Sequence, residues 1–192
     1  MGYLKRVEEK ELHSFFEGNL KDLIRDDKLK SYVVDLMIDF AHNNRIPFLY
    51  DGHLGVMGFD SGESQNRIKM YNYFKETGDI YLFLCGFFPE YLVKRKKSGL
   101  GLKSSMESGR ISYRYAVSLG AKIRDEELAI ETLSRVSKNF KEITKAIFDF
   151  RNKIDGGRLL RLNPETIREI KEVMYDGESI IDKFRVPLLN LH

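Results

Sequence analysis

The fold is decided by residues 80–89, which have the sequence IYLFLCGFFP. None of these side chains carries a charge or an amide, so a helix here is apolar on every side and lies in the middle of a fold. A membrane-spanning helix needs about 20 such residues, roughly twice this length. We therefore predict a buried central helix over residues 80–88, with Asp79 as its cap and a bend at Pro89.

Amphipathic helices are predicted on both sides of this segment. Apolar residues between positions 29 and 40 share one helical face, and a weaker face over residues 64–77 ends at Gly78. Two longer series recur at intervals of three and four residues: Leu133, Val136, Phe140, Ile143, Ile147, Phe150 and Ile154, then Ile167, Ile170, Met174, Gly177, Ile181 and Phe184. The first predicts one rod of about 28 residues. The second starts with Asn163 as N-cap and Pro164 at the first helical position, and is expected to pack antiparallel to the first.

Two further segments flank these helices. The N-terminal residues predict a helix that breaks at Gly18-Asn19 and whose inward side chains are Leu4, Val7, Leu12, Phe15 and Phe16. Glycines interrupt residues 46–64 too often for a helix, so this stretch is expected to be a long loop and a candidate pocket wall.

A helix with a stripe of small residues is predicted after residue 104. Ser104 and Glu107 have the spacing of a capping box, in which the two residues satisfy the first backbone N–H groups. Behind them, small residues recur on one face: Ser105, Gly109, Ser112, Ala116 and Gly120. Such a stripe lets another backbone approach closely, and the central helix over residues 80–88 is the expected partner.

Together these patterns predict an all-α fold, a single bundle of six to eight helices around the central segment. A chain of 192 residues fits one domain, taken as residues 1–192. Residues 1–9 lack the apolar core of a signal peptide, and the lone Cys85 excludes a disulfide framework. We expect a soluble cytoplasmic protein with no membrane contact.

Positive charge is concentrated in one stretch. The whole chain has a net charge of only +3. Residues 94–114 hold seven basic residues and the single acid Glu107, a net charge of +6, so the rest of the chain carries −3. Concentrated charge attracts anions. The candidate ligand-binding residues are therefore Lys94, Arg95, Arg110, Tyr113 and Arg114, together with Glu90 and His53.

Two interpretations of these residues remain open. Lysines at 94–97 also suit the end of a helix, where the dipole favours them. Arg110 and Arg114 lie one turn apart and repel each other unless an anion lies between them. That anion is either Glu90, in a structural ion pair, or a ligand carboxylate or phosphate, which a guanidinium binds bidentately.

The remaining candidates for chemistry are weak. Asp39 and His42 have the spacing of one half of a di-iron motif, but the chain has no second copy, so no metal and no cofactor are expected. His53 lies near Asp51 in the glycine-rich stretch, without a nucleophile beside it. Cys85 lies in an apolar segment, where burial raises the pKa of a thiol and makes it inert.

The strings LFLCGFFPEYL at 82–92 and GRISY at 109–113 carry a resemblance. They are similar to a family of uncharacterised bacterial helical proteins. The signature of that family is an apolar helix ending in Gly-Phe-Phe, then Gly-Arg-x-Ala/Ser-Tyr on the next helix. The resemblance implies a bacterial origin and a helical fold, and it supplies no activity, cofactor or residue role.

Three hypotheses for function follow from these patterns. The first is a non-enzymatic module that binds an acidic small molecule or nucleic acid through residues 94–114. The alternative is a small helical enzyme, with a pocket between the loop at 46–64 and the helices over 80–88 and 105–119. The third is a homodimer that shares the apolar faces of 133–154 and 167–184.

Overall fold

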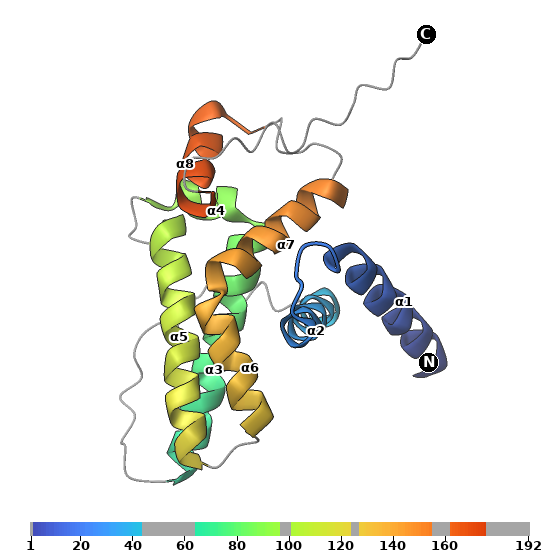
Figure 1. Ribbon diagram of the computed structural model, residues 1–192, viewed down its shortest axis with the longest axis vertical. Coiled ribbons are helices and arrows are strands. Elements are labelled where there is room, and N and C mark those ends of the chain that lie inside the picture. The colour runs from blue at the N-terminus through green and yellow to red at the C-terminus, as the bar shows by residue number, and fades with distance from the viewer. Residues whose placement is uncertain (1, 44–63, 97–100, 124–126, 155–161, 176–192) are drawn as a thin grey trace.

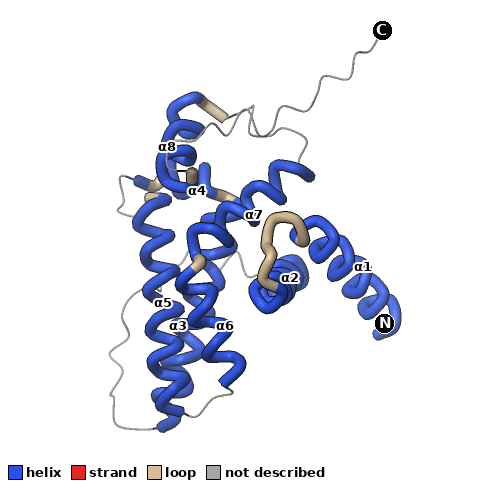
Figure 2. Tube along the Cα trace, in the orientation of Figure 1, coloured by secondary structure: helices blue, strands red, loops and turns tan. Residues whose placement is uncertain are grey.

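The computed structural model describes residues 2–43, 64–96, 101–123, 127–154 and 162–175. Within these ranges the chain forms eight helices and no strand, which confirms the all-α prediction (Figures 1 and 2). The helices are α1 (Gly2–Leu20), α2 (Asp27–Asn43), α3 (Ser64–Phe87), α4 (Pro89–Lys94), α5 (Leu102–Ile123), α6 (Glu127–Lys138), α7 (Phe140–Ile154) and α8 (Pro164–Met174). None of these helices is long and apolar enough to cross a membrane.

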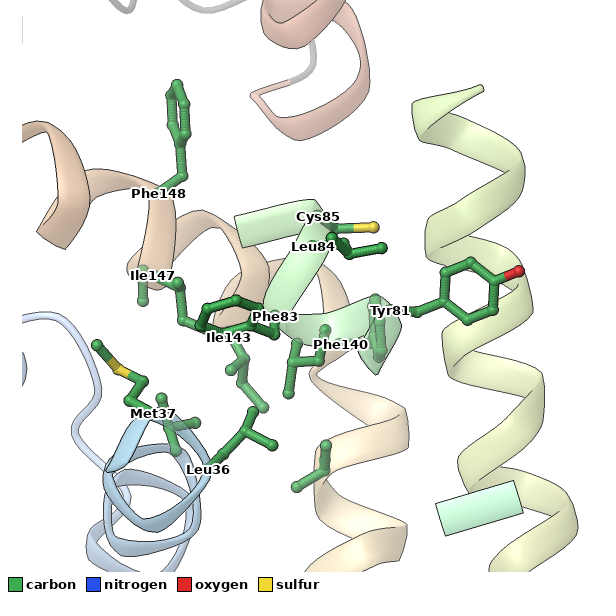
Figure 3. Packing of buried hydrophobic residues seen from close by; sticks show 14 of the residues in the cluster. Leu36, Met37, Tyr81, Phe83, Leu84, Cys85, Phe140, Ile143, Ile147 and Phe148 are labelled. Atoms are coloured by element: carbon green, nitrogen blue, oxygen red, sulfur yellow. The ribbon is translucent and has the colours of Figure 1, made fainter. Parts of the chain in front are cut away.

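The apolar segment lies at the centre of the bundle, as predicted. It forms the second half of α3, and Leu82 and Cys85 are fully buried there. Helices α2, α4, α5 and α7 all contact α3. Figure 3 shows side chains of α2 and α7 gathered around Phe83. Neighbouring helices cover this segment from several directions, so a polar face on it would be buried away from water.

The start of the central helix was predicted wrongly. Gly78 does not end a helix and Asp79 does not cap one, because α3 runs unbroken through both. Gly78 instead gives room to Tyr113, whose ring would lie 2.9 Å from an added Cβ. A glycine at position 78 is therefore explained by its close packing against Tyr113, and not by a turn.

The small-residue stripe packs against α3, as expected. All five of its residues are buried, and α5 lies beside α3 along most of its length (Figure 1). A Cβ at Gly109 would lie 2.8 Å from Cβ of Tyr81, while Gly120 faces the ring of Tyr71. The capping box is wrong in detail, because α5 begins at Leu102 and Ser104 already lies inside its first turn. The Ser104 hydroxyl donates to the Gly101 carbonyl.

The predicted 28-residue rod is two helices. Regular helix is interrupted at Asn139, and α7 leaves at an angle to α6 (Figure 1). The Arg135 carbonyl accepts the backbone N–H of Asn139 at 3.0 Å and the Asn139 side-chain amide at 2.8 Å. The apolar face nonetheless continues across the bend, with every member buried except Ile154.

Helix α8 starts as predicted. The Asn163 side chain accepts a 2.8 Å hydrogen bond from the Thr166 amide, and Pro164 opens the helix. Helix α8 contacts α4 and α5 as well as α7, so it is not simply an antiparallel partner of α7. The predicted part of this series beyond residue 175 lies outside the described residues.

Within the described residues, most of the apolar side chains assigned to a homodimer interface pack inside one chain, whereas Ile154 is 47 % exposed. Leu133, Val136 and Ile147 are no more than 2 % exposed, and Ile170 of α8 is fully buried. A shared interface through these faces would require the bundle to open. The single-domain boundary stays a prediction.

The N-terminal helix also differs from expectation. Helix α1 continues through Gly18 to Leu20, and it packs mainly against α2. Phe15 is 46 % exposed, although its ring meets Phe16 and Phe150 edge to face. Leu20 is fully buried.

Gly109→Ala is expected to lower the free energy of unfolding by about 1–3 kcal/mol, the usual cost of overpacking a core. The added methyl group would lie 2.5 Å from Cζ of Phe140. Urea unfolding followed by circular dichroism measures the change.

Gly18→Ala is the matched control. Nothing lies within 4 Å of its added methyl group, and alanine favours a helix over glycine by roughly 0.5–1 kcal/mol. If both variants are as stable as the wild type or more so, α3 and α5 do not approach as closely as described.

Candidate anion-binding surface

The basic residues of 94–114 lie on the end of α4 and on the exposed face of α5. Lys94 ends α4 and is exposed, while Lys103 and Arg114 are exposed on α5. Arg95 follows α4, and its guanidinium lies 4.9 Å from the centre of the Tyr91 ring. Lys97 lies outside the described residues.

Three of the basic residues form a line along α5. Lys103, Arg110 and Arg114 are spaced by seven and four residues, so they fall on one face of the helix. That face spans about 16 Å, at 1.5 Å per residue. It points away from α3, because the opposite face holds the buried small residues. The sequence therefore builds a basic stripe on the outside of the bundle.

A shallow hollow of about 430 Å³ lies at the start of this stripe. Its walls come from α5, from Lys96 after α4 and from Glu169 of α8. The Lys96 ammonium lies 3.3 Å from the Glu169 carboxylate. The hollow is therefore lined by charges of both signs.

Arg110 has a different partner from the predicted one. It makes two hydrogen bonds to the Glu107 carboxylate, at 3.0 and 2.6 Å, one turn earlier in α5. These bonds, together with the charges of Arg110 and Arg114, hold the pKa of Glu107 below its ordinary value. Glu107 thus pairs with Arg110 and offsets part of the positive charge of this face.

Glu90 is not part of this surface. Its carboxylate accepts two 2.8 Å hydrogen bonds from Arg151 of α7, and both side chains are nearly buried. The pair joins α4 to α7. Glu90 therefore serves the fold, and the predicted pairing with Arg110 is wrong.

Tyr113 is also placed inside the bundle. It is fully buried, and its hydroxyl donates a 2.7 Å hydrogen bond to the Asp79 carboxylate. It cannot touch a ligand on the surface without the bundle opening. Because Arg110 lies at the surface and Tyr113 in the core, these two side chains do not line one enclosed pocket.

Asp79 is the centre of a buried polar cluster that the sequence did not reveal. The Tyr32 hydroxyl of α2 also donates to its carboxylate, and Lys75 lies 2.9 Å from the other carboxylate oxygen. Burial, reinforced by the nearby Asp79 charge, raises the pKa of Tyr32 and of Tyr113 well above the ordinary value. The cluster ties α2, α3 and α5 together, and its donors match the carboxylate's acceptors.

The other candidates contribute no site within the described residues. His53 and the stretch 46–63 lie outside them. No group of three or more metal-ligating side chains occurs in the described part of the chain, and Asp39 and His42 belong to no such group. Burial raises the pKa of the Cys85 thiol, in agreement with the predicted inert cysteine.

Comparison with known proteins finds no matching family model, no matching curated protein and no matching solved structure. The resemblance of residues 82–113 to a bacterial helical family therefore stays a prediction.

Arg151→Ala is expected to lower the free energy of unfolding by about 3–5 kcal/mol, because it leaves the Glu90 carboxylate buried without its partner. Arg110→Ala is the matched control, since the pair with Glu107 is about half exposed and such pairs contribute about 0–1 kcal/mol. Thermal or urea unfolding compares the two variants. Equal losses would contradict the assignment of Glu90 to the interior.

The buried tyrosines predict a loss of stability in alkaline solution. The pKa of each hydroxyl in the folded protein lies well above the ordinary value of about 10, so above pH 10 the unfolded chain loses protons that the folded chain keeps. The contribution of these two hydroxyls to the free energy of unfolding should therefore be constant below this pH and fall above it.

The double variant Tyr32→Phe/Tyr113→Phe should show a shallower fall between pH 9 and 11 than the wild type, measured by urea unfolding at each pH. Identical slopes for the two proteins would mean that these hydroxyls are not buried.

Proposed function

We propose that this protein is a non-enzymatic binding module that engages an acidic ligand through the basic surface of α4 and α5. The observation that supports it is the concentration of charge. Lys94, Lys103 and Arg114 are all exposed, on a stretch of net charge +6 in a chain that is otherwise slightly acidic. A ligand that bears several phosphates or carboxylates matches this surface better than a single small anion does.

The burial of the remaining candidates supports the same choice. In the interior, the carboxylate of Asp79 accepts hydrogen bonds from the hydroxyls of Tyr32 and Tyr113. Glu90 and Arg151 satisfy each other in the same way. The polar groups of both clusters hydrogen-bond one another and hold helices together, whereas Lys103 and Arg114 on α5 are exposed to solvent.

The proposal includes the setting of the protein. We place it in the cytoplasm of a bacterium, free of the membrane. The single cysteine, which is buried, fits a reducing compartment. The resemblance of the central segment to a bacterial helical family supports the origin.

The test is binding of a fluorescent single-stranded oligonucleotide and of inorganic polyphosphate at rising salt concentrations. The variant is the quadruple substitution Lys94→Ala/Arg95→Ala/Lys103→Ala/Arg114→Ala. We expect the wild-type affinity to fall steeply with salt. In the variant, the slope of log K against log salt should shrink by roughly 0.7 for each phosphate contact that is lost.

A control variant removes the same number of charges elsewhere. Lys10, Lys21, Arg25 and Lys153 are all exposed and lie off the α4–α5 surface. Their replacement by alanine should leave the salt slope almost unchanged. Equal binding by the two quadruple variants, or no polyanion binding by the wild type, would end the proposal.

A further inference from the structure

An exposed tyrosine lies on the flank of the basic stripe. Tyr115 follows Arg114 in α5 and is 54 % exposed, a large fraction for an aromatic side chain. Ile111, one turn earlier on the same side of α5, is also exposed at 36 %. The surface therefore combines cations and a large apolar ring at adjacent positions of one helix.

The Tyr115 ring is held by a second aromatic residue. It stacks on Phe74 of α3, with 5.0 Å between the ring centres and 29° between the ring planes. Phe74 itself packs against the hydrophobic core and meets Tyr73 edge to face. The ring of Tyr115 is thus supported from below by the core, and more than half of the side chain still faces solvent.

The other tyrosines of this region do not share that arrangement. Tyr113 is fully buried in the Asp79 cluster. Tyr91 is partly buried and lies under the Arg95 guanidinium. Among the three tyrosines of residues 91–115, Tyr115 is the one that presents its ring to solvent.

We infer that the α5 surface binds single-stranded nucleic acid, with a base stacked on Tyr115 and phosphates on Lys103, Arg110 and Arg114. This inference rests on the proposed function, and it names the ligand class. Proteins that bind single strands combine a basic track for the backbone with aromatic side chains for the bases. Tyr115 lies about 100° around α5 from Arg114, so the cations and the ring occupy neighbouring flanks of one helix and a strand that crosses the helix can contact both.

The chemistry favours a single strand over other polyanions. Polyphosphate has no ring to place on Tyr115, and a duplex hides the faces of its bases inside the stack. In a single strand, an unpaired base offers a free aromatic face next to each phosphate. Single-stranded DNA and RNA share this chemistry, so both are used as probes.

The experiment measures fluorescence anisotropy with three strands of about 12 nucleotides, a length within the usual site size. They are an oligodeoxyuridylate, an oligouridylate with the same base on ribose, and an abasic strand with the same phosphates. The wild type should bind the two base-containing strands more tightly than the abasic strand, by roughly 5- to 150-fold, the range that one base–aromatic stack provides. The base-containing strand that binds with the higher affinity shows whether DNA or RNA is the preferred ligand.

Tyr115→Ala should lose this preference and bind all three strands as the wild type binds the abasic one. Tyr115→Phe keeps the ring and should keep the preference. A thermal melt of each variant shows that it is folded.

The outcomes separate this inference from the proposal on which it rests. If the wild type binds the abasic strand, or a duplex of the same length, as tightly as the base-containing strands, the stacking inference is overturned and anion binding stands. The same holds if Tyr115→Ala keeps the preference. If no strand and no polyphosphate binds, both are overturned.

Discussion

A helix that is apolar on every side must be covered on every side, and this requirement organises the whole bundle. The second half of α3 has no face that water can solvate, so α2, α4, α5 and α7 all contact it. Close approach is possible where glycine replaces a side chain. Gly86 of α3 faces Ile147 of α7, and Gly109 of α5 faces Tyr81 and Phe140. The positions of the neighbouring helices follow from the shape of this central helix.

The same constraint explains where the polar groups lie. A carboxylate in such surroundings is costly unless its oxygens are hydrogen-bonded. Asp79 meets this condition through two tyrosine hydroxyls and Lys75, and Glu90 meets it through Arg151. These hydrogen bonds join specific helices, so they favour one arrangement of the helices around an otherwise apolar core. One face of α5 is committed to α3, and the opposite face carries Lys103, Arg110 and Arg114, while Tyr115 lies on the flank and stacks on Phe74 of α3.

The apolar pattern predicted the buried central segment and the packing of α5 against α3, whereas several helix ends and the polar partners were predicted wrongly. The buried segment 80–88 and the Asn163 cap are visible in a few consecutive residues, and both are confirmed. The break at Asn139 was missed because the apolar spacing continues across it. The Glu90–Arg151 pair joins residues 61 positions apart, and no periodicity connects them. Asp79 was predicted to be a cap because it follows Gly78 at the start of the apolar segment. Its tyrosine donors come from α2 and α5, and no local pattern indicates them.

The one cysteine of the chain can be used to test whether the apolar half of α3 is sealed from water. Cys85 is 0 % exposed and lies within that half. The measurement is the rate at which a thiol reagent labels it as urea is added. Sealed packing predicts that labelling requires global unfolding, so the equilibrium constant for opening should depend on urea as steeply as the unfolding of the whole protein does. Labelling without urea at the rate of a free thiol would contradict the account.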